Sequence, residues 1–157
     1  MNKSRIFVDA DNCPVQVREI ILNKALELKI EVIYAANHNI PFSIESPLFK
    51  MQLCPERKNA ADDYIVENIL ENDIAVTKDI PLAQRLIDKN ISVINDRGTL
   101  FDQKKIQYLL EERELSMQMA ALGLRKAAGW SAFSKKDLAS FSKTFNNLLW
   151  EKGFYKN

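Results

Sequence analysis

The sequence predicts an α/β protein in which a parallel sheet is flanked by helices. Short apolar segments, typical of strands buried on both faces, alternate along the chain with segments of helical periodicity. Such alternation favours parallel strands joined by right-handed helical crossovers. Three strand-like segments also run directly into an aspartate, at Asp9, Asp79 and Asp96. Because the carboxyl ends of parallel strands meet at one edge of a sheet, we expect these carboxylates to gather there.

The first strand and helix follow from apolar spacing and one proline. Residues 5–9 are nearly all apolar, and Pro14 stands where a helical turn begins, a position that suits its fixed backbone angle. An apolar stripe from Val17 to Leu28 continues this helix. Residues 31–36 are the next strand-like run, and asparagine and proline then break any periodicity over residues 37–50.

The later elements keep alternating until Gly98. In chain order we expect a short strand at 51–54, a helix at 60–71, a strand from 74, a helix at 81–89 and a strand at 91–95. A long helix is expected from about residue 102 into the 120s, interrupted near Gly123 and Gly129. A last helix carries one apolar stripe, made of Leu138, Phe141, Phe145, Leu148 and Leu149.

The 157 residues are expected to form a single domain, with a sheet core over about 1–101 and a helical extension over about 102–157. Charge is unevenly distributed between the two parts. Residues 1–103 hold 12 Lys and Arg against 16 Asp and Glu, whereas residues 104–157 hold 10 against 5. A basic surface beside an acidic edge suits a polyanionic substrate. A solvated, lysine-rich helical face is the plainer alternative.

The composition predicts a cytoplasmic protein with no membrane partner. No apolar run approaches the roughly 18 residues of a membrane span, and the first strand follows the N-terminus without a signal peptide. Cys13 and Cys54 are too few for a disulfide framework and suit a reducing compartment.

A cluster of carboxylates needs a cation or a proton among its members, because like charges repel. Oxygen ligands alone select Mg²⁺ or Mn²⁺. Asp9 ends an apolar strand, and Asp11 follows two positions later, on the same side if the chain stays extended. Both are therefore candidate metal ligands. Capping of the helix near Pro14 is the structural alternative, weaker for Asp9 because it lies farther away.

A second acidic pair, Asp62 and Asp63, opens the helix expected at 60–71. Asp62 shares the apolar stripe of Ile65 and Ile69, so it faces the sheet and needs a partner or a metal there. Asp63 lies about 100° around the helix and is a weaker candidate for the metal site. Stabilisation of the helix N-terminus explains either residue without a metal.

Thr77 and Asp79 share one face of their strand, so Thr77 is placed to bind a phosphate or to orient Asp79. Asp79 also suits the cap position of the following helix. Asp96 lies between Asn95 and Arg97 in a sequence that equally favours a turn. The metal-ligand and structural interpretations stay open at both aspartates.

Other catalytic motifs are missing from the sequence. His38 is the sole histidine, in a polar loop, which makes a Ser-His-Asp triad improbable. Four glycines cannot build a phosphate-binding or dinucleotide-binding loop. Cys13 lies near a helix N-terminus, where its thiol is either activated or simply a small group fitting a tight turn.

These motifs together resemble the YaiI/YqxD family of uncharacterised bacterial proteins. The resemblance spans nearly the whole chain and rests on Asp9-Ala10-Asp11-Asn12-Cys13-Pro14-Val15, Ala61-Asp62-Asp63-Tyr64-Ile65, Val76-Thr77-Lys78-Asp79-Ile80-Pro81-Leu82-Ala83 and Asn95-Asp96-Arg97-Gly98. Arg113 to Met117, Leu124-Arg125 and Phe133 with Phe141 resemble the helical extension of the family. The segment from Gly129 to Phe133 departs from it by lacking prolines.

That family is in turn similar to PIN-like nuclease domains, which are three-layer sandwiches with an acidic Mg²⁺ or Mn²⁺ site. The resemblance implies that the core acidic positions are Asp9, Asp62, Asp79 and Asp96, with Asp11 and Asp63 in support. It implies fold and site more than reaction, because the family carries no established activity.

The favoured hypothesis is a metal-dependent nuclease that hydrolyses phosphodiester bonds in RNA or DNA, with RNA the expected partner. Candidate phosphate or substrate contacts are Asn12, Arg57, Lys58, Thr77, Lys78 and Arg97. A phosphatase of the haloacid-dehalogenase type, with Asp9 as nucleophile, is one alternative. The other is a nucleic-acid- or protein-binding module without turnover, in which the basic helices carry the binding.

Overall fold

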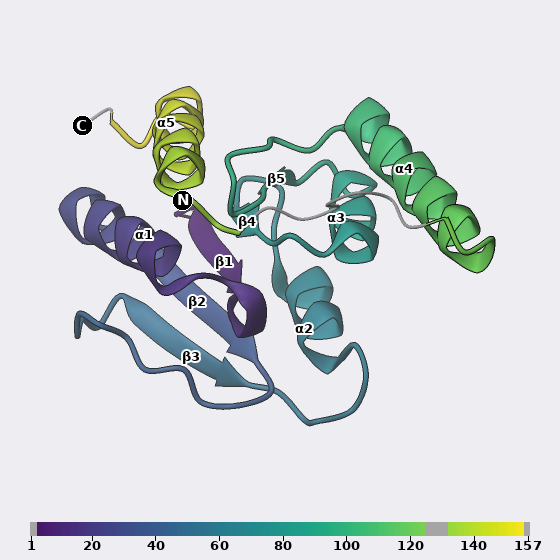
Figure 1. Ribbon diagram of the computed structural model, residues 1–157. Coiled ribbons are helices and arrows are strands. Elements are labelled where there is room, and N and C mark those ends of the chain that lie inside the picture. Colours follow the sequence, from purple (N-terminus) through teal and green to yellow (C-terminus); the bar gives the residue numbers. More distant parts are fainter. Residues whose placement is uncertain (1–2, 125–131, 156–157) are drawn as a thin grey trace.

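A five-stranded parallel sheet forms the centre of the computed structural model, which describes residues 3–124 and 132–155 (Figure 1). The spatial order is β3-β2-β1-β4-β5, and every neighbouring pair is parallel. The predicted α/β class is therefore confirmed. The strands are β1 (Arg5–Asp9), β2 (Glu31–Ala36), β3 (Phe49–Leu53), β4 (Ile74–Val76) and β5 (Ser92–Ile94).

Helices cover both faces of the sheet and complete three layers. In Figure 1, α1 and α5 lie on one face, and α2, α3 and α4 lie on the other. The helices are α1 (Val15–Leu28), α2 (Ala60–Asn68), α3 (Ile80–Ile87), α4 (Gln103–Ala121) and α5 (Lys135–Glu151), with a single 3₁₀ turn, η1 (Ala10–Asn12), after β1. Within the described ranges, no helix combines the length and apolar character that a membrane crossing requires.

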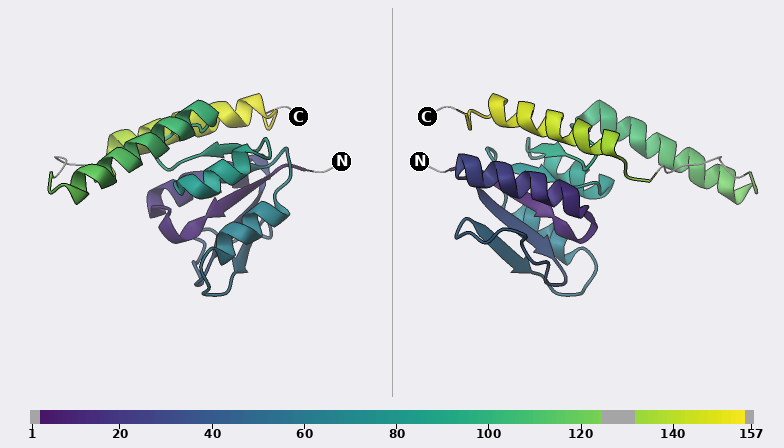
Figure 2. Two further views of the ribbon diagram at one scale, coloured as in Figure 1. Left: turned by 90° about the vertical axis from the view of Figure 1, so that its right-hand side faces the viewer. Right: turned by 60° about the vertical axis from the view of Figure 1, so that its left-hand side comes forward.

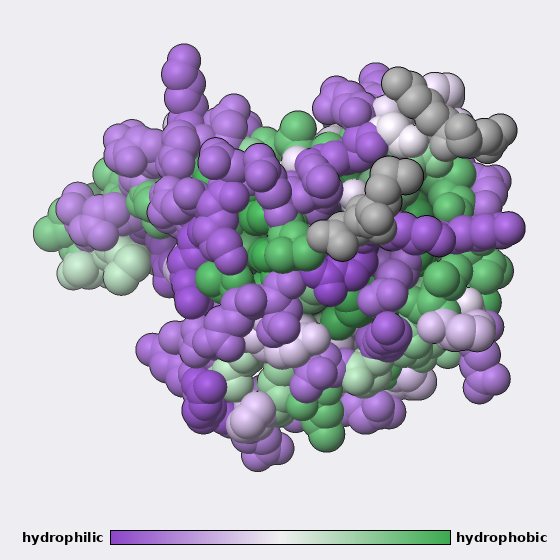
Figure 3. Space-filling model, turned by 180° about the vertical axis from the view of Figure 1, so that it is seen from behind, coloured by the Kyte–Doolittle hydropathy of each residue, from purple (hydrophilic) through white to green (hydrophobic). Residues whose placement is uncertain are grey.

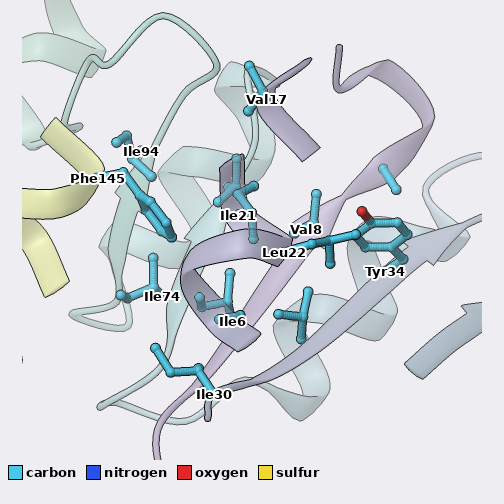
Figure 4. Packing of buried hydrophobic residues seen from close by; sticks show 14 of the residues in the cluster. Ile6, Val8, Val17, Ile21, Leu22, Ile30, Tyr34, Ile74, Ile94 and Phe145 are labelled. Atoms are coloured by element: carbon cyan, nitrogen blue, oxygen red, sulfur yellow. The ribbon is translucent and has the colours of Figure 1, made fainter. Parts of the chain in front are cut away.

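Two hydrophobic clusters, one on each face, explain why the strands are apolar throughout. Alternate residues of β1 point to opposite faces, as in any strand. Ile6 and Val8 join the cluster beneath α1 and α5, together with Phe145 (Figure 4), whereas Phe7 joins the cluster beneath α2, α3 and α4. Burial on both faces removes the alternation of polar and apolar residues that an exposed sheet face would show.

The strand order places a topological switch point beside β1. The chain passes from β1 to β2 and β3 on one side of the sheet, and then returns to β4 and β5 on the other. Val8 of β1 is in register with Val76 of β4, so the residues that follow, Asp9 and Thr77, lie side by side at the carboxyl edge. Ligands of open α/β sheets bind at such points.

Several element boundaries differ from the sequence prediction. β3 begins at Phe49, earlier than expected, and α2 ends at Asn68 rather than at residue 71. Buried Asp73 explains the early end of α2. Its carboxylate accepts hydrogen bonds from the backbone N–H groups of Leu70, at 2.8 Å, and Arg5, at 2.7 Å. These bonds tie the end of α2 to the first residue of β1.

The C-terminal helices divide between the two faces. α4 packs on α3 and α5 packs on α1, and Figure 2 shows both along the same side of the molecule, with α4 projecting beyond the sheet. Exposed apolar residues lie near the end of α4, at the left of Figure 3, where the surrounding surface is largely hydrophilic. The expected interruption at Gly123 is confirmed, since α4 ends at Ala121. Arg125 and Gly129 lie outside the described residues.

Candidate active site at the carboxyl edge of the sheet

Asp9 is the centre of the candidate site and is only 8% exposed. Its Oδ2 accepts a hydrogen bond of 2.8 Å from the Thr77 hydroxyl, whose oxygen in turn accepts one of 3.0 Å from the Asp79 backbone N–H. Burial raises the pKa of Asp9 to about 6, partly offset by the Thr77 hydrogen bond. The charges of Asp62, Asp79 and Asp11 raise it further.

Asp62 and Asp79 approach Asp9 from the N-termini of two helices. Asp62 lies in the first turn of α2 and makes no capping bond, because Asn59 holds the cap position. Burial, followed by the charge of Asp79, raises the pKa of Asp62. Asp79 caps α3 by accepting a 2.9 Å hydrogen bond from the Leu82 backbone N–H. Asp79 is therefore both a structural cap and a member of the acidic group.

These side chains line one depression, which we call the acidic cleft. It encloses about 240 Å³, and the carboxylates that line it are exposed Glu56 and four aspartates, Asp9, Asp11, Asp62 and Asp79. Asn12 and Lys58 also line it. The structure thus brings together residues from β1, η1, α2 and the β4–α3 connection, which are separated by up to 70 positions in the chain.

Asp11 lies in η1, at the rim of the acidic cleft. Its Oδ2 accepts a 3.2 Å hydrogen bond from the Asn37 backbone N–H. Its Oδ1 lies 2.9 Å from His38 Nδ1, without the geometry of a hydrogen bond. The side chain of His38 is 63% exposed, in keeping with the surface position expected for it.

Asp96 is buried beside Asp9 but outside the acidic cleft. The two residues line a separate small depression with Asn12, Cys13, Thr77 and Lys78. Burial raises the pKa of Asp96, and the positive charges of Lys78 and Arg97 oppose that rise. The turn predicted at Asp96 is stabilised by Asn95 and not by Asp96 itself. Asn95 Oδ1 accepts hydrogen bonds from the backbone N–H groups of Arg97 and Thr99.

Asp63 and Arg97 form ion pairs with other charged side chains. Asp63 pairs with Arg57 at 3.3 Å and with Arg85 at 2.9 Å, and these hydrogen bonds lower the pKa of Asp63. It does not line the acidic cleft. Arg97, a candidate substrate contact, pairs with Asp137 of α5 at 2.9 Å. Lys78 is exposed, whereas Thr77 is buried and serves to orient Asp9.

The cysteine thiols do not form a reactive site. Cys13 and Cys54 are both free. Burial, followed by the charge of Asp96, raises the pKa of Cys13 to about 12. A thiolate is the nucleophilic form of cysteine, so the activated-thiol interpretation of Cys13 is wrong.

Sequence reasoning did not connect two basic residues with the acidic group. Arg85 of α3 lowers the pKa of Asp62, and Arg113 of α4 lines a groove of about 850 Å³ that also includes Asp62 and Asp79. The net positive charge of residues 104–157 and the resemblance of the segment from Arg113 to Met117 to the family's helical extension pointed to this region, but neither placed Arg113 beside the acidic group. Arg85 gave no local signal, because its partners come from a different helix.

The acidic cleft fits a divalent cation in its chemistry. Its metal-binding groups are carboxylate oxygens of the kind that Mg²⁺ and Mn²⁺ prefer. Burial and, after it, the charges of the neighbouring aspartates raise the pKa of Asp9, and a cation would offset the contribution of those charges. Within residues 3–124 and 132–155, no three His, Cys, Asp or Glu side chains are grouped closely enough to hold one ion as they stand. Sharing an ion therefore requires side-chain rotation.

Comparison with known proteins identifies the family. The family model described as "Uncharacterized BCR, YaiI/YqxD family" matches residues 7–151. A UPF0178 protein of Treponema denticola is 41% identical over 145 residues, which cover 92% of this chain and 91% of that protein. UPF0178 proteins of Pseudoalteromonas atlantica and Psychrobacter cryohalolentis are each 34% identical over 92% of this chain, covering 97% and 99% of their own lengths. No solved structure matches. The chain belongs to the YaiI/YqxD family of uncharacterised proteins.

Proposed function

We propose that the protein is a metal-dependent nuclease that hydrolyses phosphodiester bonds in nucleic acid, with RNA as the expected substrate. The observation that carries this proposal is the meeting of four aspartates in one cleft at the topological switch point of the sheet. Clusters of acids are typical of functional sites. Holding several acids together in a partly buried place costs free energy, so a fold keeps such a cluster where its function requires it.

The surroundings of the cleft suit a polyanionic substrate. The groove of about 850 Å³ shares Lys58, Asp62 and Asp79 with the acidic cleft. Lys78 and Arg113 add two further positive side chains to its walls. Cations along a groove bind phosphates without regard to base sequence and therefore position a strand.

Each residue has a distinct role in the proposal. Asp9, Asp62 and Asp79 would hold Mg²⁺ or Mn²⁺, which activates water and stabilises negative charge on phosphorus when bound. Thr77 fixes the orientation of Asp9 through its 2.8 Å hydrogen bond. Asp96 and Lys78 line one small depression with Asp9, and the charge of Lys78 opposes the rise that burial causes in the pKa of Asp96. Asp11 adds negative charge at the rim.

Calorimetry and cleavage assays test the proposal together. Wild-type protein is titrated with Mn²⁺ and is then incubated with end-labelled single-stranded RNA and DNA. We expect Mn²⁺ binding and Mn²⁺-dependent cleavage, both lost in Asp9→Asn and Asp62→Asn. Asp63→Asn is the matched control, because it removes a neighbouring carboxylate that lies outside the cleft. Wild-type protein that binds no Mn²⁺ and cleaves neither strand overturns the proposal.

The binding module without turnover is a second candidate, favoured by the spread of the carboxylates, no three of which are grouped for one ion within the described ranges. It predicts that Asp9→Ala leaves RNA affinity unchanged or improved. Substitution of the exposed residues Lys104, Lys135 and Lys136 would weaken binding and flatten its dependence on salt. RNA affinity measured at several salt concentrations distinguishes the two functions.

A further inference from the structure

A further cavity shares Asp11 with the acidic cleft. It encloses about 430 Å³ between the start of α1 and the loop that follows β2. We call it the Tyr34 pocket, defined by Asp11, Arg18, Tyr34, His38 and Phe42. Its volume is within the range of about 300–1,000 Å³ that is usual for small-molecule sites.

Tyr34 contributes a buried hydroxyl that lacks a hydrogen-bond partner. Its side chain is 0% exposed, and among the described residues no atom forms a hydrogen bond with its oxygen. In Figure 4 the ring rises from β2, with the hydroxyl oxygen (red) at its far end. Burial raises the pKa of this hydroxyl, and the adjacent guanidinium of Arg18 opposes that rise without forming a hydrogen bond of good geometry. Buried polar groups are nearly always hydrogen-bonded, so this hydroxyl is a candidate group for bonding to a ligand.

Asp11 supplies a second buried oxygen in the same pocket. Its Oδ1 likewise makes no hydrogen bond within the described ranges, although His38 Nδ1 lies 2.9 Å away. The pocket therefore holds one unsatisfied acceptor, on Asp11, and one unsatisfied hydroxyl, on Tyr34. Arg18, whose Nε donates a 3.2 Å hydrogen bond to the Cys13 carbonyl, adds positive charge.

The remaining wall is apolar and partly aromatic. Phe42 packs on Tyr34 with ring centroids 4.3 Å apart, and Val15, Ile40 and Pro41 complete this wall. A planar heterocycle has apolar faces and a polar edge, so it matches an apolar wall that carries a few hydrogen-bonding groups. Arg18 adds one positive charge to the pocket, and Asp11 and Glu19, which also line it, add two negative charges.

We propose that the Tyr34 pocket binds a nucleobase, as a subsite for one nucleotide of a strand whose backbone crosses the acidic cleft. Asp11 lines both cavities, so a strand passing over it places a base in one while a phosphate lies in the other. The inference rests on the proposed function, because that function supplies the strand. Base recognition itself requires neither a metal nor cleavage.

Nucleotide binding without metal tests this inference independently of catalysis. In EDTA, wild-type protein is titrated with AMP, GMP, CMP and UMP, and with ribose 5-phosphate as a probe that lacks the base. We expect at least one nucleotide to bind about tenfold more tightly than ribose 5-phosphate. Tyr34→Phe, which removes only the hydroxyl, should weaken that nucleotide about tenfold. Tyr64→Phe, on the opposite face of the sheet, is the matched control and should leave its affinity unchanged.

The stability of Tyr34→Phe separates a ligand from an ordered water. If only a ligand bonds to the Tyr34 hydroxyl, the unliganded Tyr34→Phe variant should unfold in urea with at least the stability of wild type. Lower stability together with unchanged nucleotide affinity means that a structural water alone satisfies the hydroxyl, and this result overturns the inference. Absence of preferential binding of any nucleotide also overturns it.

An eight-residue single-stranded RNA in EDTA distinguishes a strand from a free nucleotide. Loss of RNA affinity in Tyr34→Phe supports the strand subsite. If the substitution weakens the binding of mononucleotides but not of the RNA, the pocket is a free-nucleotide site and the strand subsite is overturned. Asp62→Asn should retain nucleotide binding while losing cleavage. Nucleotide binding without any cleavage by wild type would therefore refute the proposed nuclease, and cleavage without nucleotide binding would refute only the subsite.

Discussion

The candidate site shows how far single residues can be interpreted from their sequence position. Asp9 was predictable, because an apolar strand that runs into an acid places that acid at the carboxyl edge whatever the strand order. The helical stripe likewise distinguished Asp62 from Asp63. What the sequence could not show is the partner of Asp63, since Arg85 lies on another helix and 22 positions away. Contacts of this kind depend on helix packing, which local periodicity does not encode.

The raised pKa of Asp9 predicts a specific dependence of stability on pH. The folded protein holds a proton at Asp9 up to a pKa of about 6, against an ordinary value of 3.8. Between these values the folded state binds more protons than the unfolded chain, so the free energy of unfolding falls as pH rises. The full effect amounts to roughly 3 kcal/mol.

Urea unfolding in EDTA between about pH 4 and pH 7 measures this effect. The stability of wild type should fall with pH relative to Asp9→Asn, which carries no titrating group at position 9. Asp62 and Asp96, whose pKa values are also raised, are present in both proteins and largely cancel. Parallel pH profiles would show that Asp9 titrates normally in the folded protein.

At the scale of elements, periodicity located the helices and strands but not all of their ends. β2 was placed correctly because its six apolar or half-buried residues stand between a helix and an irregular loop. The early end of α2 was missed because Asp73 and Arg5, which fix it, meet only in the folded chain. Helix caps were easier to predict, since Asp79 bonds to a residue three positions away.

Substitutions at Asp79 should separate its role as a helix cap from its role in cation binding. Asp79→Asn keeps a side-chain oxygen that can accept from the Leu82 N–H, so its stability should stay close to wild type. Asp79→Ala should lose about 1 kcal/mol, the usual contribution of a cap. Both variants should weaken Mn²⁺ binding measured by calorimetry. Mn²⁺ affinity that is retained in Asp79→Asn would show that this residue is only a cap.

Gly98 should be needed for the contact between the β5–α4 connection and α5. Its φ is +84°, and an added Cβ would lie 2.5 Å from the Ser140 backbone oxygen. Gly98→Ala must therefore displace α5 as well as strain the backbone. Gly123→Ala is the matched control, because φ is +75° there and nothing lies within 4 Å. We expect Gly98→Ala to lower the urea midpoint clearly more than Gly123→Ala does, and equal losses would contradict the contact.

At the scale of the whole molecule, the sheet is stable only when both faces are covered. Phe141 and Phe145 of α5 are fully buried on one face, and Ile106 of α4 is fully buried on the other. The apolar stripe of the last helix predicted that it would pack, but not onto which face. That choice depends on the packing of α5 against α1, which the local sequence of α5 does not encode.

Shared coverage of the sheet predicts one cooperative unfolding transition. Phe145→Ala should cost about 3–5 kcal/mol and Ile106→Ala about 2–5 kcal/mol. Circular dichroism and tryptophan fluorescence, to which Trp150 of α5 contributes, should report the same midpoint in each variant. A fluorescence change that precedes the loss of helical signal in Phe145→Ala would instead show that α5 detaches on its own.

The place of α5 in the chain has a consequence during synthesis on the ribosome. Ile6, Val8 and Ile94 lie in strands that are made long before Phe141 and Phe145 emerge to cover them. The part of this apolar surface that α5 covers therefore stays exposed until translation is almost finished. Exposed apolar surface of this kind promotes aggregation. Shielding of this surface by a chaperone during elongation would lower that risk.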